Sequence, residues 1–373
     1  MQQLETPKGP LTLYRYPRRK SETLRAWDAA DEYLLSQIGA EISGRILIVN
    51  DAFGALSCAL AEHLPVMLTD SYLSLWSTRE NLQSNGIAMD AVQLIDSVTA
   101  YEGLYDWVLV RVTKTLGLLE DELIRLRPHL KPETRVVGCG MVKQIHNSTL
   151  DLFEHIIGPT KTSLARKKAR LIYTTPDLSI ARSASPYPVV YTLEGTDYSL
   201  VNHANVFSRD SLDIGTRLLL KHIPSKSDYR DIVDLGCGNG VVGLIAAERN
   251  PQATVHFVDE SAMAVASARE TLSRSGLENS VCFLQGDGLT DFKPESADLI
   301  LCNPPFHHGN VVGDEIAWRM FNQARRVLRK GGELRVIGNR HLNYHVKLKR
   351  LFGDVQQLAS DRKFVVLQSF SRE

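Results

Sequence analysis

The second half of the chain alternates short apolar runs with segments in which apolar residues recur every three or four positions. Short apolar runs bounded by turn formers are typical of buried strands, and the longer spacing is typical of helices with one buried face. The pattern predicts helices over residues 241–249, 262–275 and 315–328, the last of them ended by Gly331-Gly332. It predicts strands over residues 232–235, 254–258, 281–284, 299–302, 333–337, 355–358 and 364–368.

Strands that alternate with helices in this way indicate a mostly parallel sheet covered on both faces. Only a short connection separates the last two predicted strands, so they are expected to pair as an antiparallel hairpin. The sequence therefore predicts an α/β fold with a doubly wound, Rossmann-like sheet that ends in an antiparallel hairpin.

The first half of the chain repeats the same motifs in a degenerate form. Residues 45–56 resemble residues 230–242, and each segment has the pattern of an apolar strand, a turn and a helix. The other matches follow in the same order: Thr69-Asp70-Ser71 with Val258-Asp259-Glu260, Arg79–Leu82 with Arg269–Leu272, Asp106–Arg111 with Asp298–Asn303, Arg135–Gly138 with Arg335–Gly338, and Lys167–Ile172 with Arg362–Leu367.

Because the matching segments occur in the same order and at nearly the same spacings in both halves, they indicate two tandem copies of one fold. Turn formers between residues 176 and 189 mark the junction, so we predict domains at residues 1–180 and 190–373. Residues 190–224 have no counterpart between residues 1 and 44 that can be aligned from the sequence.

The composition is that of a globular protein, with 373 residues, 43% hydrophobic and 23% charged. No apolar run approaches the roughly 18 residues that a membrane-spanning helix needs, and the N-terminus lacks the layout of a signal peptide. The five cysteines form no CxxC pair, which gives no indication of a zinc site or a disulfide framework. We therefore expect a cytoplasmic protein with no metal and no membrane contact.

Charge is balanced overall, with 43 basic and 43 acidic residues, so the total gives no support for a nucleic-acid partner. Basic side chains nevertheless cluster in residues 15–25, 161–170 and 325–350. Each cluster is either a solvated surface or a surface that binds phosphates.

A glycine-rich loop follows the first strand of the second copy. Asp234 lies at the end of that strand, and Gly236, Cys237, Gly238, Asn239 and Gly240 form the loop. The glycines also fit the dinucleotide pattern GxGxxG, which is weak evidence alone. The acidic residue before the glycines, together with the Asn-Pro-Pro-Phe motif described below, favours S-adenosylmethionine (SAM) as the cofactor. Asp234 is expected to face the ammonium group of SAM, directly or through water.

Two further carboxylates follow the next strands. Asp259 is expected to bind the ribose hydroxyls, as carboxylates do at this edge of nucleotide-binding sheets. Asp287, followed by Gly288, is expected to accept a hydrogen bond from the adenine amino group. Taken singly, Asp259 is also compatible with a helix N-cap, and Asp287-Gly288 with an ordinary turn.

The motif Asn303-Pro304-Pro305-Phe306 follows the fourth strand. An exocyclic amine of a nucleobase is a poor nucleophile, because its lone pair is delocalised into the ring. Two fixed acceptors, the side-chain oxygen of Asn303 and the carbonyl of Pro304, would orient this amine and stabilise its developing positive charge. Pro304 and Pro305 stiffen the loop, and Phe306 offers a face for base stacking. His307 or His308 could relay the proton; the alternative for the whole motif is a rigid turn.

The first copy has lost these features. Asn50-Asp51-Ala52-Phe53-Gly54 replaces the glycine loop, and Phe53 is expected to fill the space of a cofactor. Arg111-Val112-Thr113-Lys114 replaces the Asn-Pro-Pro-Phe motif. We therefore predict an inactive domain that binds RNA through phosphates, or alternatively a structural remnant. The RNA-contacting residues predicted in it are Arg111, Lys114, Arg166, Lys167, Lys168 and Arg170.

These features together resemble a class I SAM-dependent methyltransferase, and in particular the ribosomal RNA guanine-N2 methyltransferases that carry a duplicated domain. The form of residues 50–60 favours the large-subunit enzymes, which act on 23S rRNA, over the small-subunit enzymes. The resemblance implies methylation of guanine N2 at one position of 23S rRNA, whereas the motifs alone leave guanine and adenine both open. The segments that carry the resemblance are residues 27–35, 50–60, 193–197, 202–209, 212–215, 258–261 and 303–307.

Several alternatives stay open from the sequence. Phe207 is expected to contact RNA and close over the site, although a position in the core is equally compatible. A small-subunit guanine, a DNA adenine or a protein glutamine also suits an Asn-Pro-Pro-aromatic loop, and an inactive RNA-binding assembly factor is a further alternative. Because two copies are already fused, we expect a monomer.

Overall fold

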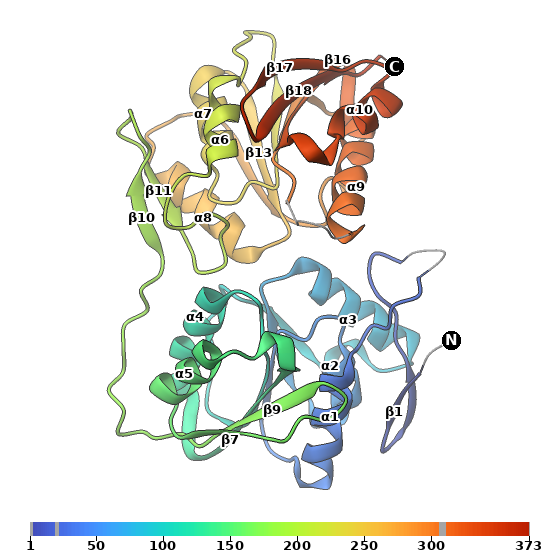
Figure 1. Ribbon diagram of the computed structural model, residues 1–373, viewed down its shortest axis with the longest axis vertical. Coiled ribbons are helices and arrows are strands. Elements are labelled where there is room, and N and C mark those ends of the chain that lie inside the picture. Colours follow the sequence, from blue (N-terminus) through green and yellow to red (C-terminus); the bar gives the residue numbers. More distant parts are fainter. Residues whose placement is uncertain (1–2, 19–21, 306–310, 373) are drawn as a thin grey trace. The chain divides into compact units, whose positions relative to one another are not determined.

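The chain folds into two compact units, Met1–Tyr187 and Pro188–Glu373. The structure is a computed structural model that describes residues 3–18, 22–305 and 311–372. Figure 1 shows the first unit from blue to green and the second from green to red. Each unit contains its own seven-stranded sheet, and each is described here by itself.

The sheet of the second unit has the strand order β14-β13-β12-β15-β16-β18-β17. The pairings among the first five strands of this order are parallel, whereas β18 runs antiparallel to both β16 and β17. The predicted doubly wound sheet with an antiparallel hairpin is therefore confirmed. The strands are β12 (Asp231–Leu235), β13 (Thr254–Asp259), β14 (Val281–Gln285), β15 (Ala297–Cys302), β16 (Leu328–Asn339), β17 (Gln356–Ser360) and β18 (Phe364–Phe370).

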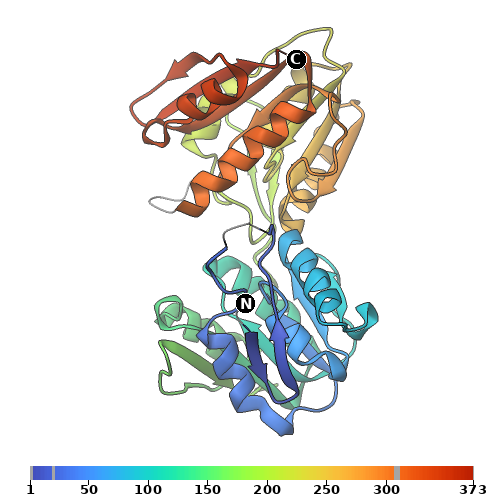
Figure 2. The ribbon, with the colours of Figure 1, turned by 90° about the vertical axis from the view of Figure 1, so that its right-hand side faces the viewer.

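Helices cover both faces of this sheet because its strands are apolar on both sides. One face packs against α6 (Ile214–Lys221), α7 (Val241–Arg249) and α8 (Ala262–Ser273). The other packs against α9 (Val311–Val327) and α10 (Tyr344–Phe352). Figure 2 shows α9 as the long orange helix beside the second sheet.

One predicted helix end is wrong. Helix α9 ends at Val327, and Gly331-Gly332 lie within β16 rather than at a helix C-terminus. The pairing of β16 with β15 shifts register after Ala297, so that the glycines fall in an irregular stretch of strand. Backbone hydrogen bonds between both glycines and Ser371 hold this stretch in place.

The sheet of the first unit repeats the topology of the second, with the order β5-β4-β3-β6-β7-β9-β8. The two-copy prediction is thus confirmed strand by strand. The strands are β3 (Ile46–Val49), β4 (Val66–Thr69), β5 (Gln93–Asp96), β6 (Tyr105–Arg111), β7 (Leu130–Met141), β8 (Thr160–Thr162) and β9 (Ala169–Thr174). The helices of the first unit are α1 (Ala29–Ile38), α2 (Ala55–Ala59), α3 (Tyr72–Ser84), α4 (Leu116–Leu126) and α5 (Asn147–Ile156). Short 3-10 helices cover Gly39–Glu41, Ala61–His63, Met89–Ala91, Arg127–His129 and Val142–Gln144 in the first unit, and Arg340–Leu342 in the second.

The structure supplies a counterpart that the sequence could not align. Each unit opens with an antiparallel hairpin, β1 (Gln3–Thr6) with β2 (Gly9–Thr12) in the first and β10 (Val189–Thr192) with β11 (Ser199–Asn202) in the second. The chain after β2 hydrogen-bonds to α3 through Asn81, whereas β11 hydrogen-bonds to α8 through Thr271. The duplicated unit therefore includes the opening hairpin.

One predicted match between the copies is off by one residue. The backbone N–H groups of Asn50 and Gly236 donate to the carbonyls of Leu68 and Val258, both at 2.8 Å. Leu68 thus corresponds to Val258, and Thr69 rather than Asp70 corresponds to Asp259. The first copy consequently has a threonine where the second has the carboxylate predicted to bind ribose.

Candidate active site

The glycine-rich loop joins β12 to α7 and depends on left-handed backbone conformations. Gly236, Gly238 and Gly240 have φ angles of 79°, 53° and 79°, which side chains other than glycine adopt only with strain. A Cβ atom on Gly240 would also lie 2.9 Å from the backbone of Ala268 in α8. The loop therefore requires glycine on conformational grounds throughout and on packing grounds at its last position.

Asp234 lies beneath this loop rather than at its surface. Its side chain is buried, and Oδ2 accepts a hydrogen bond of 2.8 Å from the backbone N–H of Gly243 in the first turn of α7. Burial raises the pKa of Asp234 to about 8. The contact with the ammonium group of SAM stays a prediction, while the structure gives Asp234 a second role in capping α7.

Asn239 and Cys237 face inward from the same loop. The side-chain amide of Asn239 donates to Oδ1 of Asn202 at 2.9 Å and so ties the loop to β11. Cys237 is buried in the core that includes α7. These two side chains hold the loop, so contact with a cofactor would come through their backbone.

Asp259 occupies the end of β13 and supports the loop. Its Oδ2 accepts from the N–H of Gly238 at 3.0 Å, and its Oδ1 accepts from the N–H of Ser261 at 3.0 Å. The alternative that Asp259 is the N-cap of the next helix is wrong, because Ser261 caps α8. Ribose binding by Asp259 stays a prediction.

Asp287 and Gly288 lie after β14 and contact α9. Arg319 forms an ion pair with Asp287 at 2.7 Å, and burial nonetheless raises the pKa of this carboxyl group. Gly288 has φ 56°, and a Cβ atom there would collide with the side-chain amide of Gln323. Arg319 and Gln323, which the sequence analysis missed, thus fix the segment predicted to contact adenine.

Asn303 lies directly after β15, next to the glycine loop. A Cβ atom on Gly236 would lie 3.9 Å from the Asn303 carbonyl oxygen, so the two predicted motifs are adjacent. The Nδ2 of Asn303 donates to Oγ1 of Thr216 in α6 at 2.9 Å. Its Oδ1 is buried and has no hydrogen-bond partner among the described residues. A buried acceptor without a partner is costly, so this oxygen calls for an explanation.

Helix α6 holds the partner of Asn303. Asp213 is the N-cap of α6 and accepts from the backbone N–H of Thr216 at 2.8 Å. The hydroxyl of Thr216 lies 3.3 Å from the same carboxylate oxygen. Since Thr216 accepts from Nδ2, the amide of Asn303 is turned so that its oxygen is the free atom. The capping residue Asp213 was a sequence signal that could have identified Thr216.

Of the remaining predicted catalytic residues, the structure describes Pro304 and Pro305. Pro304 is buried and Pro305 is exposed. Phe306, His307 and His308 lie outside the described residues.

Phe207 lies in the turn before α6 with 67% of its surface exposed, so the alternative of a core phenylalanine is wrong. Ile214, at the first position of α6, is exposed to a similar extent, 65%.

The corresponding position in the first copy has different chemistry. Arg111 ends β6, as Asn303 follows β15, and it forms two hydrogen bonds of 3.0 Å with the carboxylate of Asp28. Its guanidinium also lies 3.2 Å from Asp31. The prediction that Arg111 binds RNA phosphates is therefore wrong, because both carboxylates already neutralise a largely buried side chain.

The loop of the first copy is closed by its own side chains. Asn50 keeps the left-handed conformation of Gly236 with φ 64°, and Gly54 keeps that of Gly240 with φ 80°. Asp51 is buried and accepts from the backbone N–H groups of Ala55 and Ser57. Phe53 packs against the first core, beneath the guanidinium of Arg15. The first copy thus has side chains at Asn50 and Ala52, where the second copy has Gly236 and Gly238.

Four of the other predicted RNA contacts, Arg166, Lys167, Lys168 and Arg170, lie on one hairpin. Lys167 and Lys168 form the turn between β8 and β9, with φ angles of 48° and 62°, and both are exposed together with Arg166. Lys167 forms an ion pair of 3.1 Å with Glu32, and Arg170 is only partly exposed. Lys114 is exposed after β6. This basic hairpin, residues 163–170, presents charge on the surface of the first unit.

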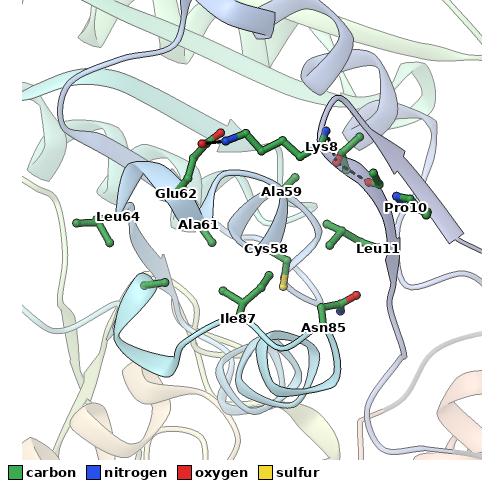
Figure 3. A pocket seen from close by; sticks show the side chains of 13 residues that line it. Lys8, Pro10, Leu11, Cys58, Ala59, Ala61, Glu62, Leu64, Asn85 and Ile87 are labelled. Carbon is green, nitrogen blue, oxygen red and sulfur yellow. Dashed lines mark hydrogen bonds and ion pairs between the residues drawn. The ribbon is translucent and has the colours of Figure 1, made fainter.

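A cavity of about 510 Å³ lies in the first unit, away from the modified loop. Figure 3 shows it between the hairpin β1–β2, which contributes Leu11, and α2, which contributes Cys58. An ion pair between Lys8 and Glu62 spans its rim. The cavity does not include residues 50–54 and is not a remnant of the cofactor site.

Neither a metal-binding cluster nor a membrane-spanning helix is found in the part of the chain that the structure describes. No group of three or more His, Cys, Asp or Glu side chains is placed to hold a metal ion. No helix there has the length and apolarity to cross a bilayer.

Comparisons with known proteins agree with this architecture. Residues 1–178 match the family described as the RLMG N-terminal domain, and residues 197–368 match the methyltransferase small domain. A solved T. thermophilus 16S rRNA N2 methyltransferase, in complex with AdoMet and guanosine, superposes with a TM-score of 0.78 at 21% identity, covering 100% of this chain and 98% of that one. The fold and the loop geometry define a class I methyltransferase with a duplicated domain.

Full-length relatives identify the family. The ribosomal RNA large subunit methyltransferase G of Streptomyces coelicolor is 50% identical over 98% of this chain and 99% of the relative. The enzyme of the same name from Pseudomonas syringae pv. syringae is also 50% identical, over 98% of this chain and 99% of the relative. The chain belongs to the ribosomal RNA large subunit methyltransferase G family.

Proposed function

We propose that this protein transfers a methyl group from SAM to the exocyclic N2 of one guanine in 23S rRNA. The observation that carries the proposal is the buried Oδ1 of Asn303 next to the glycine-rich loop, which has no hydrogen-bond partner in residues 3–18, 22–305 and 311–372. The names of the full-length relatives support a large-subunit rRNA substrate. The guanosine bound to the 16S rRNA enzyme of the same fold supports guanine N2.

The side chains described above would act on the amine mainly by positioning it. SAM, when bound, supplies an electrophilic methyl group on a sulfonium. Asn303 Oδ1 accepts one N–H of the guanine amine, and the Pro304 carbonyl accepts the other. These acceptors direct the nitrogen lone pair away from the ring and stabilise the positive charge that develops on nitrogen. Thr216 keeps the amide in this orientation.

The cofactor-binding and catalytic residues predicted from the sequence keep their roles in this proposal. The loop from Gly236 to Gly240 holds the cofactor through its backbone, with Asp234 near the ammonium group, Asp259 at the ribose and Asp287-Gly288 at the adenine. Phe207 and Phe306 contact the base. A base inside an rRNA helix must be flipped out to reach such a site, at a cost of a few kcal/mol.

The first unit would hold the RNA. The basic hairpin and Lys114 are exposed cations on a unit that has lost its own cofactor loop, and cations of this kind bind phosphates without reading sequence. We further propose that the protein acts as a monomer in the cytoplasm, since each copy completes its own sheet.

Incubation with tritiated SAM and 23S rRNA from a strain lacking this gene tests the reaction. We expect N2-methylguanosine as the labelled nucleoside after digestion. Label in N6-methyladenosine, or transfer to protein or DNA with none to rRNA, would refute the proposal.

Charge reversal in the basic hairpin tests the RNA-holding role. We expect Lys167→Glu with Lys168→Glu to weaken rRNA binding roughly tenfold at low salt and to reduce the salt dependence of binding, while SAM affinity is unchanged. Lys293→Glu, at an exposed position between β14 and β15, is the matched control. Equal affinity of the double variant and the control would reject the hairpin as an RNA contact.

A further inference from the structure

A second amide oxygen in the second unit is buried without a partner. Asn339 ends β16, its residue is 4% exposed, and its Oδ1 has no hydrogen-bond partner in the described part of the chain. The proposed reaction above gives this side chain no role. Because folded proteins pair nearly all buried polar atoms, an unpaired one calls for an explanation.

Asn339 lies on the same face of the sheet as Asn303. Alternate residues of a strand point to opposite faces. Leu301 and Ile337 belong to the core beneath α6, and Asn303 and Asn339 follow them by two residues on the adjacent parallel strands. Gly338, in between, faces Tyr344 of α10 on the other side.

The two asparagines are close enough to contact one small ring. The register pairs Cys302 with Val336, which places Asn303 beside Ile337 and Asn339 two residues further along. Strands lie about 4.8 Å apart and rise about 3.3 Å per residue, so the two α carbons are roughly 8 Å apart. Side chains on one face of a sheet project in roughly the same direction, so two amide groups at this separation can contact neighbouring atoms of one bound ring.

These two oxygens stand out in the second unit. Among its described residues, the buried side-chain atoms without a hydrogen bond are Oδ1 of Asn303, Oδ1 of Asn339 and one guanidinium nitrogen of Arg329. That nitrogen of Arg329 forms an ion pair with Asp298 at 2.8 Å. The two atoms left without any partner are therefore amide oxygens at the carboxyl ends of neighbouring strands.

We infer that Asn339 Oδ1 accepts a hydrogen bond from the ring N1–H of the guanine whose amine is held by Asn303. This inference rests on the proposed function. Guanine presents N1–H and the N2 amine side by side, so a row of acceptors matches its edge. Adenine and cytosine carry an acceptor nitrogen beside their amine, and an acceptor at Asn339 would repel it. Asn339 thus selects guanine among planar amines, a choice that the Asn-Pro-Pro-Phe motif leaves open.

Ligand binding to the full chain tests this selection without requiring turnover. 2-Aminopurine riboside keeps the 2-amino group of guanosine but has an acceptor in place of N1–H. Its affinity and that of guanosine would be measured by saturation-transfer NMR in the presence of S-adenosylhomocysteine. We expect the wild type to prefer guanosine roughly tenfold or more, since a site built for a donor rejects the analogue lacking it.

The variant Asn339→Ala should lose this preference. We expect guanosine to bind roughly tenfold more weakly, while 2-aminopurine riboside binds as well as before or better, as a double-mutant cycle requires for a direct contact. S-adenosylhomocysteine should bind with unchanged affinity. Gln368→Ala removes another buried amide from the neighbouring strand β18 and is the matched control, which should keep the wild-type preference.

Two results would separate failure of this inference from failure of the proposed function. If the wild type forms N2-methylguanosine in 23S rRNA but Asn339→Ala keeps the full preference for guanosine, the role of Asn339 is rejected and the reaction stands. If the wild type forms no N2-methylguanosine, the proposed function fails first. A uniform loss of affinity for all ligands in Asn339→Ala would indicate misfolding of the site and would also reject a selective contact.

Discussion

The two copies differ most instructively at the ends of the corresponding strands β6 and β15. In the second unit Asn303 donates to Thr216, three residues after the capping Asp213 of α6. In the first unit Arg111 bonds to Asp28, the cap of α1, and lies near Asp31, three residues after it. Both copies thus join the fourth strand to the start of a capped helix. Among the described residues the Oδ1 of Asn303 has no partner, whereas the Arg111 guanidinium contacts two carboxylates. The contact in the second copy therefore orients the acceptor of the proposed reaction, and the contact in the first copy contributes to stability.

A second comparison concerns the carboxylate that caps the helix after the first strand. In the second copy Asp234, within the strand, accepts from the N–H of Gly243. In the first copy Ile48 takes the strand position, and Asp51, within the loop, accepts from the N–H of Ser57. The helix N-terminus needs an acceptor in both. Meeting that need from the loop places a buried carboxylate at the position that Cys237 occupies in the second copy.

The strongest test of this contrast is Asn303→Ala. Removing the acceptor should lower kcat roughly 10³-fold, as loss of one preorganised polar group at a transition state does. SAM affinity by calorimetry should stay within a few-fold, because the loop is intact. Loss of SAM binding by orders of magnitude would contradict the division of roles.

The mirror substitution, Arg111→Ala, should cost stability. It leaves Asp31 buried near Asp28 without its counter-charge, which should lower the free energy of unfolding by about 3 kcal/mol. Denaturant unfolding of the full chain measures this, and Lys114→Ala, at an exposed site nearby, should change it by less than about 0.5 kcal/mol. A variant as stable as the wild type would mean that the ion pair is dispensable.

A finer test is Thr216→Val, which removes the hydroxyl and keeps the shape. The amide of Asn303 then loses the contact that orients it, so we expect kcat to fall roughly tenfold, the effect of about 1.4 kcal/mol, with the Kd for SAM unchanged. Thr216→Ser restores the hydroxyl and should restore the rate. Equal rates for the valine and serine variants would show that Asn303 needs no partner.

The smallest expected effect concerns Asp234→Asn. Burial raises the pKa of this carboxyl to about 8 in the folded state, above its ordinary value in the unfolded chain. Its contribution to stability is therefore fully present below the ordinary pKa of about 4 and falls progressively as the pH rises to about 8. The Tm of the variant relative to that of the wild type should rise by a few degrees between about pH 4 and pH 8 and stay level above that. A constant Tm difference across this range would contradict the raised pKa.

The sequence predicted the fold well because hydrophobic periodicity and glycine positions are local signals. The strands, the parallel order and the duplication all follow from them. The ion pairs of Arg111 could not be predicted in this way, because its partners Asp28 and Asp31 lie some 80 residues earlier in the chain. Thr216 and Asn339 were missed for the same reason, since each matters only through a contact, or a missing contact, that the fold creates. The one-residue error at Thr69 arose because the sequence shows strand residues but not their hydrogen-bond register.

The hairpins β1–β2 and β10–β11 show that the duplicated unit is larger than the seven-stranded sheet and its helices. Each copy carries its own hairpin, its own covering helices and its own closing antiparallel strands, so each core is built from residues of one half. A substitution in the loop of one half therefore changes a core that the other half does not share.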